Sequence, residues 1–276
     1  MVFSSGFFGF YAHAGFLSAI REWGIEPTGY AGSSSGAILA AMGAAGMSDD
    51  DIRKILFNLK KSDFWDPESL PWILMKALRR FKGYTGFLKG KGFERLLNQL
   101  PVRTFEECAV PAVIVATDLS LQKEAVFTRG DLIKAVHASG AVPMLFKPVE
   151  LDGSFYVDGG VVNKAPLEPL SERIHPRKMI VHFITSRNLK GKPNWFLSRK
   201  WTPWQIHSLA VNIARKEAYQ RQCDIVRNHG IEIIEFRTDT PAVGPNRLDR
   251  GTMAYRQTRE ATLKFLKENG LTGKPG

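Results

Sequence analysis

The order of the elements that can be predicted along this chain indicates an α/β sandwich with a largely parallel central sheet. Two observations carry the prediction. Apolar β-rich runs alternate with helical patterns along the 276 residues, which is typical of parallel strands joined by crossover helices. In addition, a short strand near the N-terminus enters a glycine-flanked turn that leads at once into an apolar helix.

The N-terminal elements follow from local patterns. Met1–Phe3 is predicted as the end of a strand, and Ser4–Gly9 as a glycine-containing loop. His13–Trp23 is predicted as a helix because its apolar pattern runs up to a glycine. Tyr30–Ala31 is a short strand. Ala37–Ala45 is a helix of small and apolar residues on every side, which predicts that it is buried.

Two further helices are expected before residue 85. Ser48 and Asp51 form a capping box that opens a helix to about Leu59. Ser69–Lys82 is amphipathic and keeps its basic residues off the apolar face. This segment is interpreted either as a lid or membrane-facing helix, or as a helix packed on the core. Its apolar face holds Leu70, Ile73, Leu74, Ala77, Leu78 and Phe81.

The second half of the chain continues the alternation. Asp152-Gly153 lies between two short β-rich runs and is a strong two-residue hairpin signal. The expected strands are Pro111–Thr117, Glu124–Phe127, Val149–Leu151, Ser154–Val157, Lys178–Thr185 and Ile231–Phe236. The expected helices are Asp131–Ser139, Pro203–Asn228 and Asp249–Asn269. No linker, low-complexity run or repeat divides the chain, so one domain is expected over residues 1–276.

Positive charge is concentrated in two segments of a chain whose formal net charge is +11. Residues 53–103 contain 12 Lys and Arg against 4 Asp and Glu, and residues 187–227 contain 9 against 2. Basic residues mixed with tryptophan favour a lipid–water interface with anionic lipid. The alternatives are a nucleic-acid surface, or solvated basic faces over core tryptophans. The tryptophans of the two segments are Trp65, Trp72, Trp195, Trp201 and Trp204.

The first 20 residues contain no charged group, so a signal peptide or a transmembrane helix has to be considered. The segment has no basic start, and its serines and glycines would break a helix early. We therefore expect neither a signal peptide nor a transmembrane helix. The protein is expected to be cytoplasmic, with peripheral contact to an anionic membrane. Cys108 and Cys223 fit no metal or redox spacing, and no metal is expected.

Gly32-Ser33-Ser34-Ser35-Gly36 fits the G-x-S-x-G pattern of a serine nucleophile. The pattern places the serine on a strained strand-to-helix turn, where glycines avoid clashes two residues before and after it. The N-terminus of the next helix points at the site and favours a developing oxyanion. Ser33 and Ser35 are rival nucleophiles, but Ser34 alone is centred between Gly32 and Gly36.

A serine nucleophile also needs a base and an oxyanion hole. The Ser4–Gly9 loop follows a strand, and its backbone N–H groups are candidates for the hole. Asp158, followed by Gly159 and Gly160, ends the strand Ser154–Val157 and is better placed as a base than any histidine. None of the histidines lies in an obvious strand-end loop with a partner acid; they are His13, His137, His175, His182, His207 and His229.

Several short motifs follow the elbow in a fixed order. They are Val115–Leu119, Phe127–Gly130, Ala135–Pro143, Phe146–Pro148, Asp152-Gly153, Tyr156–Asn163 and Pro166. Taken with the Ser4–Gly9 loop and the Gly32–Gly36 elbow, they resemble a patatin-like phospholipase domain over about residues 1–170. Residues 171–276 resemble the family only loosely, as expected of a variable C-terminal part.

The resemblance implies a three-layer α/β/α fold and a serine lipid acyl hydrolase. It implies that Ser34 and Asp158 form a Ser–Asp dyad, with an oxyanion hole from Ser5, Gly6 and Phe7. It also implies that no metal or cofactor takes part and that the substrate is a lipid.

The chain departs from the family pattern at the loop. The usual glycine run is here Ser4-Ser5-Gly6, Phe7 and Phe8 stand where a basic residue is usual, and one residue is inserted before Gly15. Serine restricts backbone angles that glycine allows. The departures motivate a second hypothesis, a catalytically weak lipid-binding protein. A third, a nucleic-acid binder, is not favoured because no recognition motif accompanies the charge.

Overall fold

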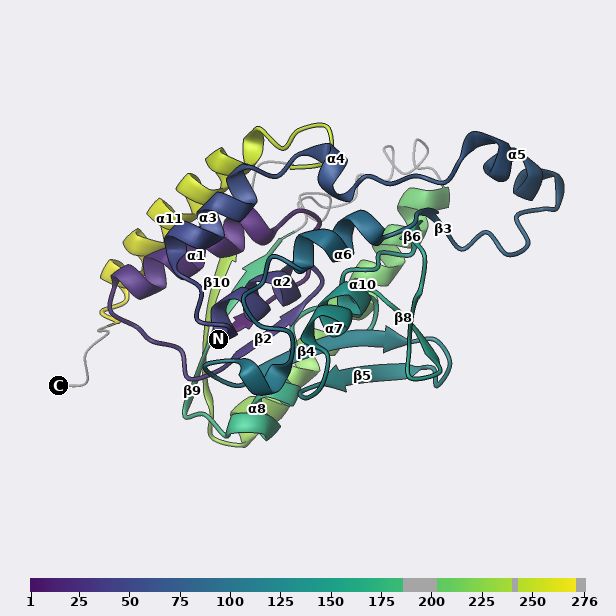
Figure 1. Cartoon of the computed structure of the whole chain (residues 1–276). Helices are drawn as coiled ribbons and strands as arrows, with labels where there is room; N and C mark the ends of the chain where they lie inside the picture. The colour runs from purple at the N-terminus through teal and green to yellow at the C-terminus, as the bar shows by residue number, and fades with distance from the viewer. Residues whose placement is uncertain (186–202, 240–242, 272–276) are drawn as a thin grey trace, which may run out of the picture.

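The computed structural model describes residues 1–185, 203–239 and 243–271, and Figure 1 shows a central sheet with helices on both faces. The strands of the main sheet are β1 (Val2–Phe3), β2 (Tyr30–Ser33), β4 (Ala112–Asp118), β5 (Lys123–Phe127), β7 (Val149–Leu151), β8 (Ser154–Val157), β9 (Lys178–Ile184) and β10 (Glu232–Thr238). Within the described residues they are ordered β10-β9-β1-β2-β4-β8-β7, and β5 pairs with β4 outside that path.

Parallel pairing runs through the centre of the sheet. Every pair in the run β10-β9-β1-β2-β4 is parallel. The antiparallel pairs among the described strands are β4 with β5, β4 with β8, and β7 with β8. The expected mainly parallel sheet is therefore confirmed, and β9 and β10 show that residues beyond 170 contribute to it.

Side chains of the central strands alternate between two cores, as strand geometry requires. Phe3 and Ile114 face the larger core, whereas Val2 and Val113 face the smaller one. The larger core is covered by α1 (Phe10–Glu22), α2 (Ser35–Ala44), α3 (Asp49–Phe57), α7 (Leu132–Ser139) and α11 (Arg250–Glu268). The smaller core is covered by α8 (Leu167–Ile174) and α10 (Pro203–Asn228). These layers confirm the three-layer α/β/α sandwich.

A smaller group of elements lies beside the larger core. It consists of α4 (Lys61–Phe64), α6 (Lys91–Leu97), and the parallel strands β3 (Gly86–Leu88) and β6 (Met144–Phe146). Phe64 and Phe93 bring α4 and α6 into contact with the core. Single 3₁₀ turns occupy Phe105–Glu107 and Gly159–Val161.

Two helix starts differ from the sequence prediction. Helix α1 begins at Phe10, one turn before His13, and is buried without interruption to Ile20. Helix α2 begins at Ser35, and all ten of its residues are buried. The earlier start of α2 follows from the strained turn, because Ser34 itself occupies the N-cap.

Predictions from local signals are confirmed. The Ser48 hydroxyl accepts a hydrogen bond from the N–H of Asp51 at 3.1 Å and caps α3. Asp152 and Gly153 both have positive φ, 49° and 79°, as a tight two-residue hairpin requires between β7 and β8. Asp131 caps α7 by accepting from the N–H of Lys134.

Helix α5 (Leu70–Leu78) contains no buried residue. In Figure 1 it projects from one end of the molecule, beyond β3 and β6. The interpretation of Ser69–Lys82 as a core-packing helix is therefore wrong. The helix does not extend to Lys82 as expected. It ends at Leu78, and Arg80 and Phe81 adopt left-handed φ values of 52° and 58°, which do not continue a helix. None of the helices in the described ranges is both long and apolar enough to cross a bilayer.

Candidate active site

The turn between β2 and α2 holds Ser34 in a strained backbone conformation, with φ 56° and ψ −121°. Such angles are unfavourable for a residue with a side chain and are maintained by the surrounding structure. The flanking glycines permit the turn. A Cβ on Gly32 would lie 2.2 Å from the carbonyl oxygen of Gly36, and a Cβ on Gly36 would lie 2.3 Å from that of Phe3.

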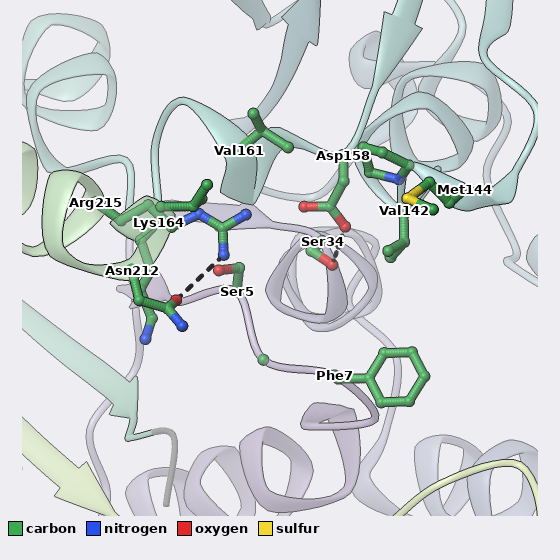
Figure 2. Close-up of a pocket in the computed structure, with 13 residues that line it drawn as sticks. Ser5, Phe7, Ser34, Val142, Met144, Asp158, Val161, Lys164, Asn212 and Arg215 are labelled. Carbon is green, nitrogen blue, oxygen red and sulfur yellow. Dashed lines mark hydrogen bonds between the residues drawn. The ribbon is translucent and has the colours of Figure 1, made fainter. Parts of the chain in front are cut away.

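Ser34 makes two hydrogen bonds that orient it. Its backbone N–H donates to the Ser139 hydroxyl at 2.9 Å. Its side-chain Oγ donates to Oδ2 of Asp158 at 2.5 Å, and both side chains are buried. Figure 2 shows the Asp158 carboxylate directed at the Ser34 hydroxyl. The rivals Ser33 and Ser35 have buried hydroxyls that make no hydrogen bond within the described part of the chain.

Asp158 directly follows β8 and is held at three points. Its N–H donates to the carbonyl of Ala141 at 2.9 Å, and its own carbonyl accepts from the Thr117 hydroxyl at 2.9 Å. Its Oδ1 accepts from the N–H of Gly160 at 2.7 Å, which leaves Oδ2 for Ser34. The carboxylate is therefore fixed in direction before any substrate binds.

The two glycines after Asp158 allow the chain to approach its neighbours closely. A Cβ on Gly159 would lie 2.1 Å from the carbonyl oxygen of Val115 in β4. A Cβ on Gly160 would lie 2.6 Å from the side chain of Ser5. Gly159 and Gly160 thus bring the aspartate loop against both the central strand and the N-terminal loop.

Burial raises the pKa of Asp158 from 3.8 to about 6. The hydrogen bonds from Ser34 and Gly160 and the positive charge of Arg215 act in the opposite direction but do not offset burial. A carboxylate with a pKa near 6 is still ionised at neutral pH, and it binds a proton more readily than an ordinary aspartate. This property suits a general base.

The loop after β1 uses its serines to attach itself to the sheet. The Ser4 hydroxyl accepts from the N–H of Ile184 at 2.8 Å, and the Ser4 N–H donates to the carbonyl of His182 at 3.1 Å. The Ser5 N–H donates to the carbonyl of Lys164 at 2.7 Å. The serines that replace the family's glycines therefore serve as structural contacts.

Only part of the predicted oxyanion set has free donors. The N–H of Ser5 donates to the carbonyl of Lys164, so Ser5 lines the pocket with this donor already in use. Among the hydrogen bonds of the described residues, none uses the N–H of Gly6 or of Phe7. Ser35 is the first residue of α2, so its N–H has no carbonyl of the same helix as an acceptor.

Neither His13 nor His182 forms a hydrogen bond with Ser34 or Asp158 within the described residues. His13 and His182 are buried together with their Nδ1 atoms 2.7 Å apart, and Nε2 of His13 lies 2.8 Å from the carbonyl oxygen of Ser4. Burial lowers the pKa of His13 to about 3 and keeps that of His182 well below its ordinary value, so both are neutral. Together they support the N-terminal loop from beneath. The side chain of His207 lies outside the described residues.

A pocket of about 410 Å³ contains Ser34 and Asp158 in its lining. Figure 2 shows that Lys164, Asn212 and Arg215 gather on one side of it, and Val142 and Met144 on the other. No pattern in the sequence predicted these three polar residues as part of the site. Lys164 follows the aspartate loop, and Arg215 lies within the basic segment 187–227, but no local pattern shows which residues of α10 face Ser34.

The tryptophan-rich segments are only partly described. Trp65 is half-buried and packs against Phe87, whereas Trp72 lies on α5 and is 39% exposed. Trp195 and Trp201 lie outside the described residues, as does the side chain of Trp204. The expected lipid-facing role can therefore be followed only in the segment 53–103.

Sequence comparisons connect this site with known proteins. The pattern of the family described as Patatin-like phospholipase matches residues 1–171. An uncharacterized NTE family protein of Mycobacterium tuberculosis is 32% identical over 166 residues, 58% of this chain and 42% of that protein. Patatin-like phospholipase domain-containing protein 7 of Rattus norvegicus is 26% identical over 236 residues, 79% of this chain and 17% of that protein. The chain spans less than half the length of these relatives.

Structural comparison gives the same fold in another protein. The crystal structure of VipD from Legionella pneumophila superposes with a TM-score of 0.53 at 15% identity, covering 96% of this chain and 66% of that one. This likeness concerns the fold alone. The family pattern, in contrast, extends over more than half of the chain and includes both Ser34 and Asp158. The chain belongs to the patatin-like phospholipase family.

Proposed function

We propose that this protein is a serine lipid acyl hydrolase that cleaves fatty-acyl esters through a Ser–Asp dyad. The observation that carries the proposal is the 2.5 Å hydrogen bond from Ser34 Oγ to Asp158 Oδ2 on a strained strand-to-helix turn. Asp158 takes the proton from Ser34 as Oγ attacks the acyl carbonyl carbon. The protonated Asp158 then returns the proton to the departing alcohol, and water cleaves the acyl-enzyme with the same base.

The oxyanion formed in each step needs hydrogen-bond donors directed at it. We assign this role to the backbone N–H groups of Gly6 and Phe7, with the N–H of Ser35 at the start of α2. The support is that these donors border the pocket or the nucleophile and that no described group uses the first two. The helix N-terminus adds a favourable partial positive charge.

The dyad is tested with two variants and a soluble p-nitrophenyl ester. Ser34→Ala and Asp158→Asn should each lower kcat/KM by roughly 10⁴-fold or more, with unchanged circular dichroism. A fluorophosphonate probe should label the wild-type protein and not Ser34→Ala. If the probe does not label the wild type while the protein still binds liposomes, the result would instead support the hypothesis of a catalytically weak lipid-binding protein.

We also propose that α5 and its flanks contact an anionic membrane. Leu74 and Leu78 are one helical turn apart and are 60% and 87% exposed. Residues 69–93 contain six Lys and Arg and no Asp or Glu. This combination suits the surface of an anionic bilayer. The exposed apolar side chains can enter the acyl region, and the basic side chains can contact the anionic headgroups.

The membrane proposal predicts that Leu74→Glu combined with Leu78→Glu weakens binding to phosphatidylserine-containing vesicles by about tenfold or more. The control is Leu121→Glu in the turn after β4, because Leu121 is 61% exposed and lies far from α5 in the sequence. Co-sedimentation measures both. Equal binding of the double variant and the control would contradict the assignment of α5.

We further propose that residues 1–276 act as one domain. Strands β9 and β10 lie in the same sheet as β1, and α10 contributes Asn212 and Arg215 to the pocket that contains Ser34. The C-terminal part beyond the family match would then be required for activity.

A further inference from the structure

A chain of hydrogen bonds links β10 to the Ser4–Gly9 loop through two buried histidines. The Thr238 hydroxyl lies 2.8 Å from Nε2 of His182. Nδ1 of His182 lies 2.7 Å from Nδ1 of His13, whose Nε2 lies 2.8 Å from the carbonyl oxygen of Ser4. Both imidazole rings are fully buried, so water does not compete for these contacts.

The last member of this chain determines the direction of every hydrogen bond in it. The Ser4 carbonyl oxygen can only accept, so Nε2 of His13 carries a hydrogen. Burial lowers the pKa of His13 to about 3 and holds that of His182 well below its ordinary value, so each ring is neutral and carries one hydrogen. Nδ1 of His13 therefore accepts from Nδ1 of His182, and Nε2 of His182 accepts from the Thr238 hydroxyl.

Aromatic side chains hold both rings in these orientations. His182 stacks on Phe16 with the ring centroids 4.4 Å apart. His13 makes an edge contact with Phe3, with the ring centroids 5.1 Å apart. A ring in a closely packed core has little freedom to turn. The N–H that His13 directs at the Ser4 carbonyl is therefore fixed in direction.

His13 also closes the Ser4–Gly9 loop on itself. It lies in the first turn of α1, where its backbone N–H donates to the carbonyl of Gly9 at 3.0 Å. Its side chain bonds to Ser4 and its backbone to Gly9, so one residue holds both ends of the loop. Gly6 and Phe7, whose N–H groups are the proposed oxyanion donors, lie between these ends.

The carbonyl that His13 holds lies directly against the turn that carries the nucleophile. A Cβ on Gly36 would lie 2.7 Å from the Ser4 carbonyl oxygen. Gly36 is the second residue of α2 and follows Ser34 by two positions. A shift of this carbonyl would therefore displace the loop relative to Ser34.

We propose that the hydrogen-bond chain from Thr238 through His182 to His13 positions the oxyanion donors of the active site. The proposal rests on the proposed hydrolase function. His13 is a positioning residue, because it acts through the Ser4 carbonyl at the start of the loop that carries the donors. Displacing the donors by about 1 Å would weaken stabilisation of the transition state by about 100-fold. Binding of the substrate in its ground state would change little, since the oxyanion forms only during the reaction.

The test compares His13→Gln with His13→Met, two side chains of nearly equal length. The glutamine amide can donate to the Ser4 carbonyl and its oxygen can accept from Nδ1 of His182, whereas methionine has no hydrogen to donate. With a soluble p-nitrophenyl ester, His13→Met should lower kcat by about 100-fold and change KM by less than about twofold. His13→Gln should restore kcat to within about tenfold of the wild type.

Leu266→Ala is the control for a general loss of stability. Leu266 is a buried residue of α11, and its truncation should lower the Tm while kcat stays near the wild-type value. Three results would each overturn the proposal: a wild-type kcat in His13→Met, a kcat no higher in His13→Gln than in His13→Met, or an equal loss of kcat in Leu266→Ala.

NMR separates this inference from the hydrolase proposal. Long-range proton–nitrogen spectra should show the ring hydrogen on Nε2 of His13 and on Nδ1 of His182. The backbone amide signals of Gly6 and Phe7 should shift in His13→Met and return toward their wild-type positions in His13→Gln. An inactive wild type with these shifts would refute the enzyme and keep the positioning of the loop. The opposite tautomers, or amide signals that do not move in His13→Met, would refute the positioning whatever the enzyme does.

Discussion

Replacing Asp158 with asparagine should stabilise the folded protein at neutral pH while it abolishes hydrolysis. The asparagine side chain has nearly the same shape, and its oxygen can still accept from the Gly160 N–H. Its amide group can donate to the Ser34 oxygen, so the two contacts of the carboxylate are both retained. What is lost is a negative charge on a residue that is 5% exposed, and with it the proposed general base.

The magnitude follows from the pKa of Asp158. Because burial raises this pKa from 3.8 to about 6, the folded protein binds the proton more tightly than the unfolded chain does. This contribution to stability is complete below pH 3.8 and is lost as the pH rises to about 6. At about 1.4 kcal/mol per pH unit, the loss amounts to about 3 kcal/mol. The asparagine variant avoids this loss, so its Tm at pH 8 should be higher by roughly 5–10 °C.

The assay is urea unfolding followed by tryptophan fluorescence at pH 4 and at pH 8, for the wild type and for Asp158→Asn. The variant's unfolding free energy, relative to the wild type, should be about 2.5 kcal/mol higher at pH 8 than at pH 4. Ser34→Ala is the control, because it is equally inactive but keeps the buried charge. A difference that does not change with pH, or a wild type that is the more stable at pH 8, would refute the reasoning.

Three other predictions follow from the same geometry. The kcat/KM of ester hydrolysis should rise about tenfold per pH unit up to an apparent pKa near 6, since only ionised Asp158 accepts a proton; a flat profile from pH 4 to pH 8 would contradict this. Ser139→Ala leaves the buried N–H of Ser34 without its acceptor and should cost about 1–3 kcal/mol of unfolding free energy in urea; unchanged stability would show that the N–H finds another partner. Gly32→Ala places a Cβ 2.2 Å from a backbone oxygen and should lower kcat by about 100-fold or more, since a 1 Å displacement of a reacting group has that effect. Gly244→Ala, with no atom within 4 Å, is its control and should keep full activity.

Local features of the fold could be predicted because each depends on a few neighbouring residues. The Ser48 cap, the Asp152-Gly153 hairpin and the elbow at Ser34 are all present where expected. Boundaries were less accurate where a distant contact extends an element. Helix α1 begins before His13 because the packed sheet below it buries Phe10 and its neighbours as well.

The pairing of Ser34 with Asp158 came from the family resemblance and not from spacing. The two residues are 124 positions apart, and only the sheet brings them within 2.5 Å. The tertiary structure supplies two features that support the proposed chemistry. Ser34 and Asp158 share a hydrogen bond, and a second hydrogen bond from Gly160 orients the buried carboxylate.

The sequence by itself determined the alternation of strands and helices, the strained turn at Ser34 and the positions of the glycines around it. These features are encoded by periodicity and by backbone angles, which a short stretch of chain expresses alone. Only the tertiary structure decided that α5 is exposed, that the N–H of Ser5 is occupied, and that Lys164 and Arg215 share a pocket. Each of these depends on which side chains and carbonyls from separate segments meet, and no single segment carries that information.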